Sequence, residues 1–361
     1  MTTHQQYMDR CLELAKRGAG AVAPNPMVGA VLVHHDRIIG EGWHKKFGEA
    51  HAEVNCIASV KEEDRALLSQ SVLYVSLEPC SHFGKTPPCT DLIIRNKIPT
   101  VVIGCRDPFK EVDGKGIEKL KAAGIEVVTG VLEQECKELN KRFFLFHTRQ
   151  WPYVILKWAQ TADGKMAPPT PARGDLADQP QRLLISNEYS NRLVHKWRSE
   201  EAALLVGTNT ALLDDPELTT RLWPGNSPVR LVIDLNLRLP VSLKLFNGAV
   251  KTIVFNTIKK EEKKNLIYYK LEDGKKLLPQ LLTALYELNI QSVLVEGGAT
   301  LLQSFIEDGN WDEARIITNE IVFITNGLDA PVLTNAHKTE EQQLLSDKIT
   351  ICKPGKLPAA D

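Results

Sequence analysis

The feature that most restricts how this chain can fold is an ordered set of metal-binding side chains near its start. His51 is followed two positions later by Glu53, and Pro79-Cys80 and then Cys89 come downstream. One imidazole and two thiolates suit a tetrahedral zinc ion whose fourth position stays open to water. The fold therefore has to bring residues 51, 80 and 89 to one point.

Glu53 adds an acid–base group to this set. It lies at the expected start of a helix, from which its carboxyl can face the open metal position without binding the ion. There it can take a proton from water and deliver it to a leaving amine. This order of residues is the pattern of zinc deaminases. We predict that Glu53 is catalytic and that His51, Cys80 and Cys89 are the zinc ligands.

Two simpler interpretations stay open for these residues. Buried free thiols beside a surface histidine and glutamate occur in ordinary cores. A purely structural zinc site needs a fourth protein ligand, and His82 is the nearby candidate. Both leave a glutamate beside the histidine without a role, and the catalytic interpretation therefore explains more.

The pattern of apolar residues predicts two α/β domains. A hairpin over 27–43 is followed by alternating helices and strands, and the first half ends in an amphipathic segment over 132–146. The pattern restarts with a buried strand at 153–158, and we place the domains at 1–147 and 148–361. A length of 361 residues agrees with two domains.

Composition argues against several other functions. The formal net charge of −1 gives no overall basic field, so we expect no nucleic-acid partner. The seven cysteines are odd in number and irregularly spaced, which indicates free thiols in a reducing compartment. No apolar run approaches membrane-spanning length. We therefore expect a cytoplasmic protein without a membrane partner.

The spacing of the two cysteines narrows the deaminase class. Eight residues separate Cys80 from Cys89, where nucleoside and RNA deaminases usually have two. The segment PCSHFGKTPPC, together with PNPMVGAVLV upstream, resembles the pyrimidine deaminase domain of riboflavin biosynthesis over about the first 145 residues. The resemblance implies a cytidine-deaminase-like three-layer α/β/α fold. It also implies deamination of 2,5-diamino-6-(5-phosphoribosylamino)pyrimidin-4-one, with substrate contacts from Asn25, His44, His82 and Lys85.

Three segments of the second half resemble, in this order, the reductase domain of the same pathway, which has a dihydrofolate-reductase-like α/β fold. They are KWAQTADGK from residue 157, VGTNTALLDDPELTTR from 206 and VEGGATL from 295. The resemblance implies an NADPH-dependent reduction of the ribosyl group to ribityl. It implies cofactor contacts from Ala159, Thr210, Asp214, Gly298, Ala299, Thr300, Leu301 and Leu302. It implies substrate contacts from Lys157, Arg198, Leu218, Arg221 and Glu296, with the two arginines suited to a phosphate.

One segment departs from the reductase pattern. Leu184 stands where the family carries a tryptophan, which removes an aromatic surface beside the cofactor and puts the contacts of Arg182 and Leu184 in question. The overall prediction is a bifunctional, homo-oligomeric enzyme that uses Zn²⁺ and NADPH on a small phosphoribosylated pyrimidine. Two alternatives are a nucleic-acid-editing deaminase fused to an unrelated domain and a zinc deaminase whose C-terminal half is a non-catalytic binding or oligomerisation module.

Overall fold

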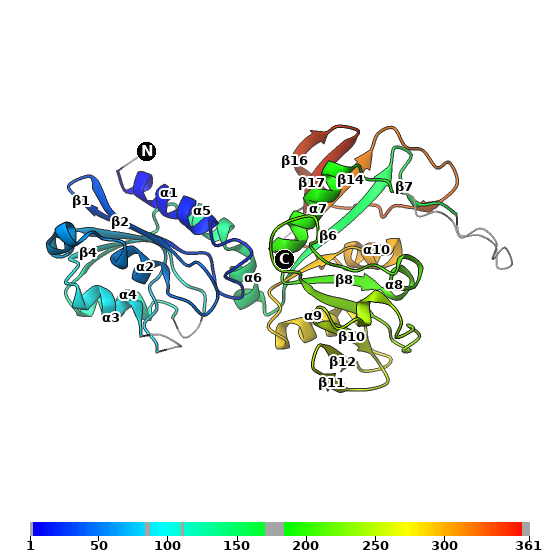
Figure 1. The fold of residues 1–361 in the computed structure, drawn as a ribbon, viewed down its shortest axis with the longest axis horizontal. Coiled ribbons are helices and arrows are strands. Elements are labelled where there is room, and N and C mark those ends of the chain that lie inside the picture. Colours follow the sequence, from blue (N-terminus) through cyan, green and yellow to red (C-terminus); the bar gives the residue numbers. More distant parts are fainter. Residues whose placement is uncertain (1–2, 84–86, 110–111, 170–183, 356–361) are drawn as a thin grey trace, which may run out of the picture. The chain divides into compact units, whose positions relative to one another are not determined.

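The structure, a computed structural model, describes residues 3–83, 87–109, 112–169 and 184–355. It divides into two compact units, Met1–Gln150 and Trp151–Asp361. The first unit ends after helix α6 (Lys141–Arg149), a helix that the boundary placed after residue 147 would cut. Figure 1 shows a separate sheet with its own helices in each unit, in agreement with the expected α/β class.

The first unit is built on a five-stranded sheet in the order β2-β1-β3-β4-β5. Its strands are β1 (Gly29–His34), β2 (Arg37–Trp43), β3 (Val72–Leu77), β4 (Thr100–Cys105) and β5 (Glu126–Thr129). The strand β1 runs antiparallel to both β2 and β3, and β3, β4 and β5 run parallel to one another. The predicted hairpin over 27–43 is therefore present.

Helices cover both faces of this sheet because its strands are apolar on both sides. Val31 and Val33 pack towards α1 and α5, whereas Ala30 and Leu32 pack towards α2, α3 and α4. Figure 1 shows these two groups on opposite faces, as expected for a three-layer α/β/α arrangement. The helices are α1 (Thr3–Lys16), α2 (Ala52–Ala58), η1 (Glu62–Gln70), α3 (Cys89–Arg95), α4 (Lys115–Ala122) and α5 (Glu133–Leu139).

The amphipathic segment over 132–146 is not one continuous helix. It divides into α5 and α6 at Asn140, whose backbone has φ −106° and ψ 25°. The Asn140 side chain bonds both backbone groups of Met27. The apolar pattern of the sequence does not reveal this break, because the contact between Asn140 and Met27 leaves the spacing of apolar residues unchanged.

The second unit contains a ten-stranded sheet in the order β11-β12-β10-β9-β8-β13-β6-β14-β17-β16. Its central strands are parallel, and antiparallel pairs lie towards both edges. The strands are β6 (Tyr153–Thr161), β8 (Ala203–Gly207), β9 (Val229–Ile233), β10 (Thr252–Asn256), β11 (Glu261–Lys263), β12 (Leu266–Lys270), β13 (Ser292–Val295), β14 (Glu313–Asn319), β16 (Ala336–Leu344) and β17 (Asp347–Pro354). A small second sheet pairs β7 (Lys165–Ala167) with β15 (Leu328–Asp329).

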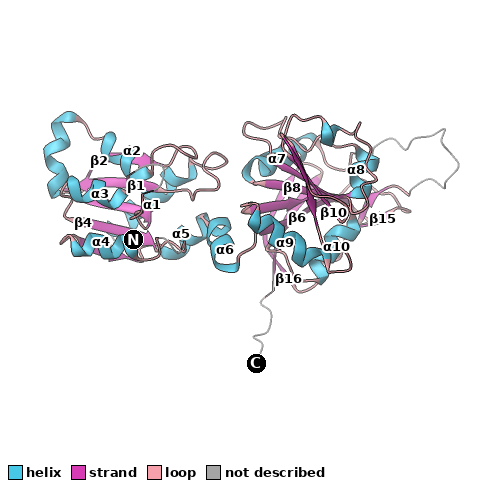
Figure 2. Cartoon of the chain, turned by 90° about the horizontal axis from the view of Figure 1, so that it is seen from below, coloured by secondary structure: helices cyan, strands magenta, loops and turns pink. Residues whose placement is uncertain are grey.

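The larger sheet also has helices on both faces. The apolar sides of α9 and α10 form one core with alternate residues of β6, β8 and β13, and α7 lies on the other face (Figure 2). The helices are α7 (Glu188–Glu200), α8 (Thr208–Asp214), η2 (Lys244–Phe246), α9 (Leu277–Glu287) and α10 (Ala299–Glu307).

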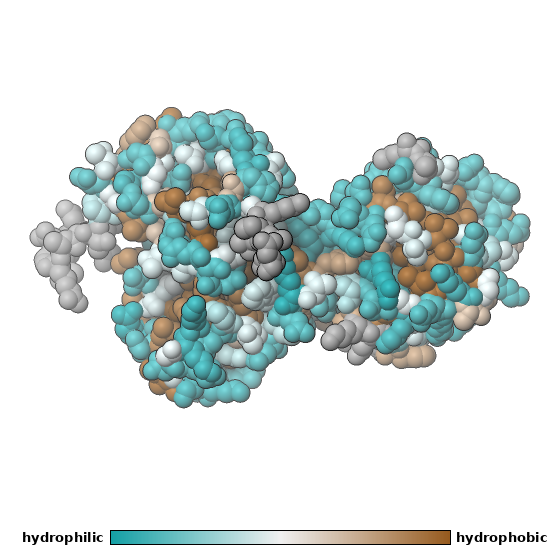
Figure 3. All heavy atoms as spheres, turned by 180° about the vertical axis from the view of Figure 1, so that it is seen from behind, coloured by the Kyte–Doolittle hydropathy of each residue, from teal (hydrophilic) through white to brown (hydrophobic). Residues whose placement is uncertain are grey.

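The strands from β14 onwards were not expected from the sequence. The edge strand β16 has the sequence AHKTEEQQL and is exposed at every residue except the last, so it lacks the alternation that marks a half-buried strand. Figure 3 shows hydrophilic side chains around the rim of each unit and apolar ones gathered towards its middle on the face turned to the viewer. Among the described residues, none of the helices combines the length and apolar character needed to span a bilayer.

Candidate functional site

The three predicted zinc ligands meet at the ends of two helices and one strand. His51 directly precedes α2 in extended backbone, Cys89 is the first residue of α3, and Cys80 lies just after β3. His51 Nδ1 lies 3.6 Å from Cys80 Sγ and 3.4 Å from Cys89 Sγ, and the three atoms fall within 4.8 Å of one another. Zinc bonded to nitrogen at about 2.0 Å and to sulfur at about 2.3 Å in a tetrahedron separates these atoms by about 3.5 Å. The residues therefore fit a zinc ion bound through Nδ1.

The charges of the site suit a metal and an acid–base group. Hydrogen bonds with Cys89 and with His51 lower the pKa of the Cys80 thiol, although burial by itself would raise it. The lowered pKa favours the thiolate form of Cys80. Glu53 is buried in the first turn of α2. Burial and the charge of Cys80 raise the pKa of Glu53 to about 7. A carboxyl group with a pKa near neutrality can both accept and return a proton.

Asn25 and His44, both expected to contact substrate, lie together beside the first ligand. His44 Nδ1 is 3.0 Å from the Ala50 carbonyl oxygen, which can only accept, so this nitrogen carries the proton. The other nitrogen, Nε2, accepts a hydrogen bond from Asn25 Nδ2 at 3.1 Å. Burial lowers the pKa of His44, which favours this neutral form. The rings of His44 and His51 are 5.5 Å apart.

The other two expected deaminase contacts lie on the segment between the cysteines. The ring of His82 lies 6.4 Å from that of Phe109, and its Nδ1 is buried without a hydrogen-bond partner among the described residues. The nitrogen is thus available to a ligand or to water. Lys85 lies outside the described residues.

Two buried acidic residues near Cys80 were missed by sequence reasoning. The carboxylate of Glu78 accepts hydrogen bonds from the backbone N–H groups of Asp107, Gly114, Gly116 and Ile117 at 2.9–3.3 Å. These bonds hold the 107–117 segment against the turn that carries Cys80. Burial, and then the charges of Glu78 and Cys80, raise the pKa of Asp107 to about 7. The only sequence signal for Glu78 was its position two residues before a ligand.

In the second unit, Arg198 and Glu296 form a bidentate ion pair. Arg198 Nε and Nη2 lie 2.9 Å and 2.7 Å from the two Glu296 oxygens, and the side chains are 14% and 5% exposed. Burial alone would raise the pKa of Glu296, but the charges of Arg198 and Lys157 lower it to about 2. Lys157 on β6, Arg198 on α7 and Glu296 after β13 are thus brought together.

A histidine that sequence reasoning missed lies in the same place. His195, one turn before Arg198, is buried, hydrogen-bonds the Thr219 carbonyl and has no partner for Nδ1 among the described residues. Burial and the charges of Arg198 and Arg221 lower its pKa to about 4. Arg198 Nη1 donates to the same carbonyl at 3.2 Å. The segment with Leu218, which is buried, and Arg221, which is exposed, is therefore anchored on α7.

The residues expected to contact the cofactor divide into those with accessible surface and one, Leu302, that is buried. Thr210 packs on Gly297, where an added Cβ would meet its side chain at 2.9 Å, so the start of α10 and α8 are in close contact. The start of α10 has part of its surface accessible at Gly298, Ala299, Thr300 and Leu301. Ala159 on β6 and Asp214 at the end of α8 are also at least partly accessible. Leu302 is fully buried in the core and its N–H donates to the Gly298 carbonyl at 3.1 Å. The buried side chain and the paired N–H of Leu302 give no support to a cofactor contact from this residue, which stays a prediction.

The altered segment before α7 leaves an apolar side chain at the surface. Leu184 is 73% exposed, and Arg182 lies outside the described residues. A leucine offers no aromatic face for a cofactor ring to stack on.

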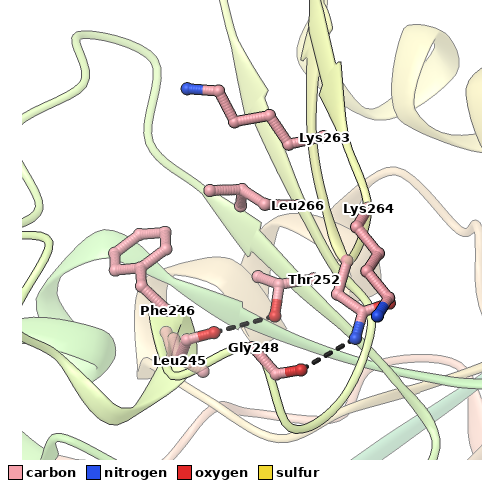
Figure 4. Close-up of a pocket in the computed structure, with 8 residues that line it drawn as sticks. Leu245, Phe246, Gly248, Thr252, Lys263, Lys264 and Leu266 are labelled. Carbon is pink, nitrogen blue, oxygen red and sulfur yellow. Dashed lines mark hydrogen bonds between the residues drawn. The ribbon is translucent and has the colours of Figure 1, made fainter.

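A pocket of about 260 Å³ lies elsewhere, between η2 and the strands β10 and β12 (Figure 4). Phe246, Thr252 and Leu266 line it, and Thr252 Oγ1 donates to the Leu245 carbonyl at 2.8 Å. Lys263 at its rim pairs with Glu261 at 2.7 Å. The pocket lies at the amino ends of the parallel strands, whereas Glu296 follows the carboxyl end of β13. It contains none of the predicted site residues.

Models of two protein families match the chain. Residues 1–105 match the cytidine and deoxycytidylate deaminase zinc-binding region, and residues 152–335 match the RibD C-terminal domain. All four residues of the predicted zinc centre lie in the first match, and all the predicted reductase residues lie in the second. Nothing in these matches favours an unrelated C-terminal domain or a C-terminal half that is only a non-catalytic binding or oligomerisation module.

Curated proteins and solved structures agree with both matches. The riboflavin biosynthesis protein RibD of Aquifex aeolicus is 42% identical over 316 residues, which cover 85% of this chain and 84% of that protein. The RibD protein of Escherichia coli is 33% identical over 326 residues, 86% and 85% of the two chains. The crystal structure of a diaminohydroxyphosphoribosylaminopyrimidine deaminase/5-amino-6-(5-phosphoribosylamino)uracil reductase from Thermotoga maritima is 38% identical, has a TM-score of 0.84 and covers 97% and 98% of the two chains. Acinetobacter baumannii RibD is 31% identical with a TM-score of 0.84, covering 98% and 99%.

Proposed function

Since the chain belongs to the RibD family of riboflavin-biosynthesis proteins, we propose that its two sites act on one phosphoribosylated pyrimidine in succession. It is a bifunctional enzyme, a zinc-dependent deaminase and a reductase. The first step converts 2,5-diamino-6-(5-phosphoribosylamino)pyrimidin-4-one and water into the corresponding uracil and ammonia. The second reduces the ribosyl group to ribityl with NADPH and a proton.

In the deaminase site, His51, Cys80 and Cys89 would hold the zinc ion, which would supply Lewis-acid activation of water. Glu53 takes a proton from the attacking water and gives it to the departing amino group, so that ammonia leaves without a net change in the charge of the enzyme. Asn25 and His44 line the substrate side, and His82 and Lys85 meet the base or the phosphate. The observation that carries this assignment is the thiol–imidazole triangle with a buried glutamate of raised pKa beside it.

In the reductase site, a bound NADPH would be the hydride donor for C1′ of the sugar, in its ring-opened imine form. We propose that Ala159, Thr210, Asp214 and residues 298–301 bind the cofactor. The close packing of Thr210 on Gly297 supports this placement, because it brings the two cofactor-binding segments together. The protein's task is to hold the nicotinamide and C1′ at reacting distance.

The geometry refines the expected roles of the two arginines. Three nitrogens of Arg198 are already used, on Glu296 and on the Thr219 carbonyl. Arg221 is 51% exposed and lies 3.6 Å from Glu217, its nearest acidic partner. We therefore propose that Arg221 binds the substrate phosphate. Arg198 and Lys157 then hold the Glu296 carboxylate towards the substrate, and Leu218 forms part of the wall of the substrate site.

Product analysis by liquid chromatography tests the proposed function. Incubation of the pyrimidine with the enzyme alone should yield the deaminated ribosyl compound and ammonia, and addition of NADPH should convert it to the ribityl compound. Reduction without prior deamination, or no ammonia release by zinc-loaded enzyme, would contradict it. A cytoplasmic location, a homo-oligomeric state and the absence of nucleic-acid binding stay proposals, and sedimentation and filter-binding assays check the last two.

A further inference from the structure

The loop that carries Asn25 has few backbone groups with which to hold its shape. Pro24 and Pro26 flank Asn25 and have no N–H to donate. Asn25 N–H donates to the Val22 carbonyl at 2.9 Å, and beyond Pro26 the backbone is next held at Met27. The Val28 carbonyl then accepts from the His44 N–H at 2.9 Å, so Met27 is one of the few points that set the position of Asn25 beside His44.

One side chain from a distant part of the chain binds both backbone groups of Met27. Asn140 Oδ1 accepts from the Met27 N–H at 2.8 Å, and Asn140 Nδ2 donates to the Met27 carbonyl at 2.8 Å. Asn140 is 4% exposed. It directly precedes α6, where an asparagine side chain ordinarily caps the helix. Asn140 makes no such capping bond, so its side chain serves the loop and not the helix.

We propose that Asn140 is a positioning residue of the deaminase site, which holds the Asn25 loop against His44. A line of contacts supports this role. Asn140 binds Met27, Asn25 binds His44 Nε2, and His44 Nδ1 binds the Ala50 carbonyl directly before the ligand His51. The proposal rests on the proposed deaminase function. It adds a residue well beyond the zinc-binding region matched over 1–105.

The test substitutes Asn140→Asp in the full chain. The carboxylate has the same shape but cannot donate to the Met27 carbonyl, so two acceptors face each other. We expect the KM for deamination to rise about tenfold, the effect of losing one buried hydrogen bond and its alignment. Zinc content and the NADPH-dependent reduction of already deaminated substrate should stay at the level of the unsubstituted enzyme.

The matched control is Asn96→Asp. The Asn96 amide donates to the Leu92 carbonyl at 2.8 Å at the end of α3, so this variant loses a comparable bond in which the Asn25 loop takes no part. Its deaminase KM should not change. Asn140→Ala, which buries no charge, repeats the test if Asn140→Asp does not fold.

Two results would overturn the proposal. The first is an unchanged deaminase KM in Asn140→Asp and Asn140→Ala. The second is a loss of activity that follows only the fall in melting temperature, to the same extent as in Asn96→Asp. Failure of the proposed function itself looks different, because the unsubstituted, zinc-loaded enzyme would then release no ammonia.

Discussion

The two sites of this chain are organised in different ways. In the first unit, the reactive groups crowd around one point, with His51 Nδ1 3.4 Å and 3.6 Å from the two thiols and Glu53 buried beside them. In the second unit, the corresponding groups are distributed over β6, α7, α8 and the start of α10. Two charged side chains of this second site, Arg198 and Glu296, are already paired with each other.

The difference follows from what each site has to hold. A metal ion is a point, and its ligands must converge on it whatever elements they come from. A nicotinamide cofactor and a phosphoribosyl substrate are extended, so their contacts are spread over several strand ends and helix starts. The first site should therefore fail all at once when one ligand is lost, and the second should fail by degrees.

The largest expected effect is the loss of a zinc ligand. Cys89→Ser should abolish zinc binding and deamination together, because this thiolate is one of the three proposed ligands. The second unit should still reduce deaminated substrate at the normal rate. Metal analysis and the two separate assays check this, with Cys352→Ser, a buried cysteine of the other unit, as the control. Full zinc content in Cys89→Ser would remove that residue from the ligand set.

Loss of the proton carrier should separate metal binding from chemistry. Glu53→Gln should keep about one zinc per chain and lose roughly 10²–10⁴-fold in the rate of ammonia release, because an amide cannot transfer the proton. Its oxidation of NADPH with deaminated substrate should match that of the unsubstituted enzyme. Near-normal deamination by Glu53→Gln would refute the assigned role.

In the second unit, Glu296→Gln should lower both the free energy of unfolding and the rate of substrate reduction. Removal of one partner leaves the Arg198 charge buried and unpaired, at a cost of about 3–5 kcal/mol. Deamination should continue, since the first unit has its own core. Urea unfolding and NADPH oxidation measure the two effects, and Glu320→Gln, which loses a half-exposed pair with Lys348, is the control.

The stability difference should depend on pH in a defined direction. The pKa of Glu296 is lowered from 4.5 to about 2. A lowered pKa means that the carboxylate contributes stability above its ordinary pKa and loses it as the pH falls towards 2. The gap in unfolding free energy between the enzyme and Glu296→Gln should therefore be full at pH 7 and narrow between about pH 5 and 2. A gap that widens on acidification would contradict the ion pair.

The smallest effect is expected at the exposed arginine. Arg221→Ala should raise the KM for deaminated substrate by about tenfold or less and leave kcat nearly unchanged, as expected when binding energy is lost equally before and during reaction. Adding salt should weaken substrate binding in the unsubstituted enzyme more than in the variant. An equal loss of kcat would instead place Arg221 near the reacting carbon.

The sequence predicted the first site more fully than the second. Few residue types bind zinc, so His51, Cys80 and Cys89 and the nearby Glu53 were recognisable from their order alone. The reductase residues were predicted only through resemblance, because a glutamate, a lysine and two arginines form no distinctive local pattern. His195 could not be found in this way, since a histidine on an apolar helix face is usually a core residue.

What the sequence by itself determined is which side chains are candidates for the chemistry and that two α/β domains carry them. The tertiary structure decided that His51 turns Nδ1 towards the two thiols, that Glu78 accepts from four backbone N–H groups, that Asn140 binds Met27 and that Leu302 is in the core. The contacts of Glu78 and Asn140 join residues 29 to 113 positions apart through backbone groups. Every residue has nearly the same backbone groups, so such pairings leave no mark in the sequence and appear only when the strands and helices have packed.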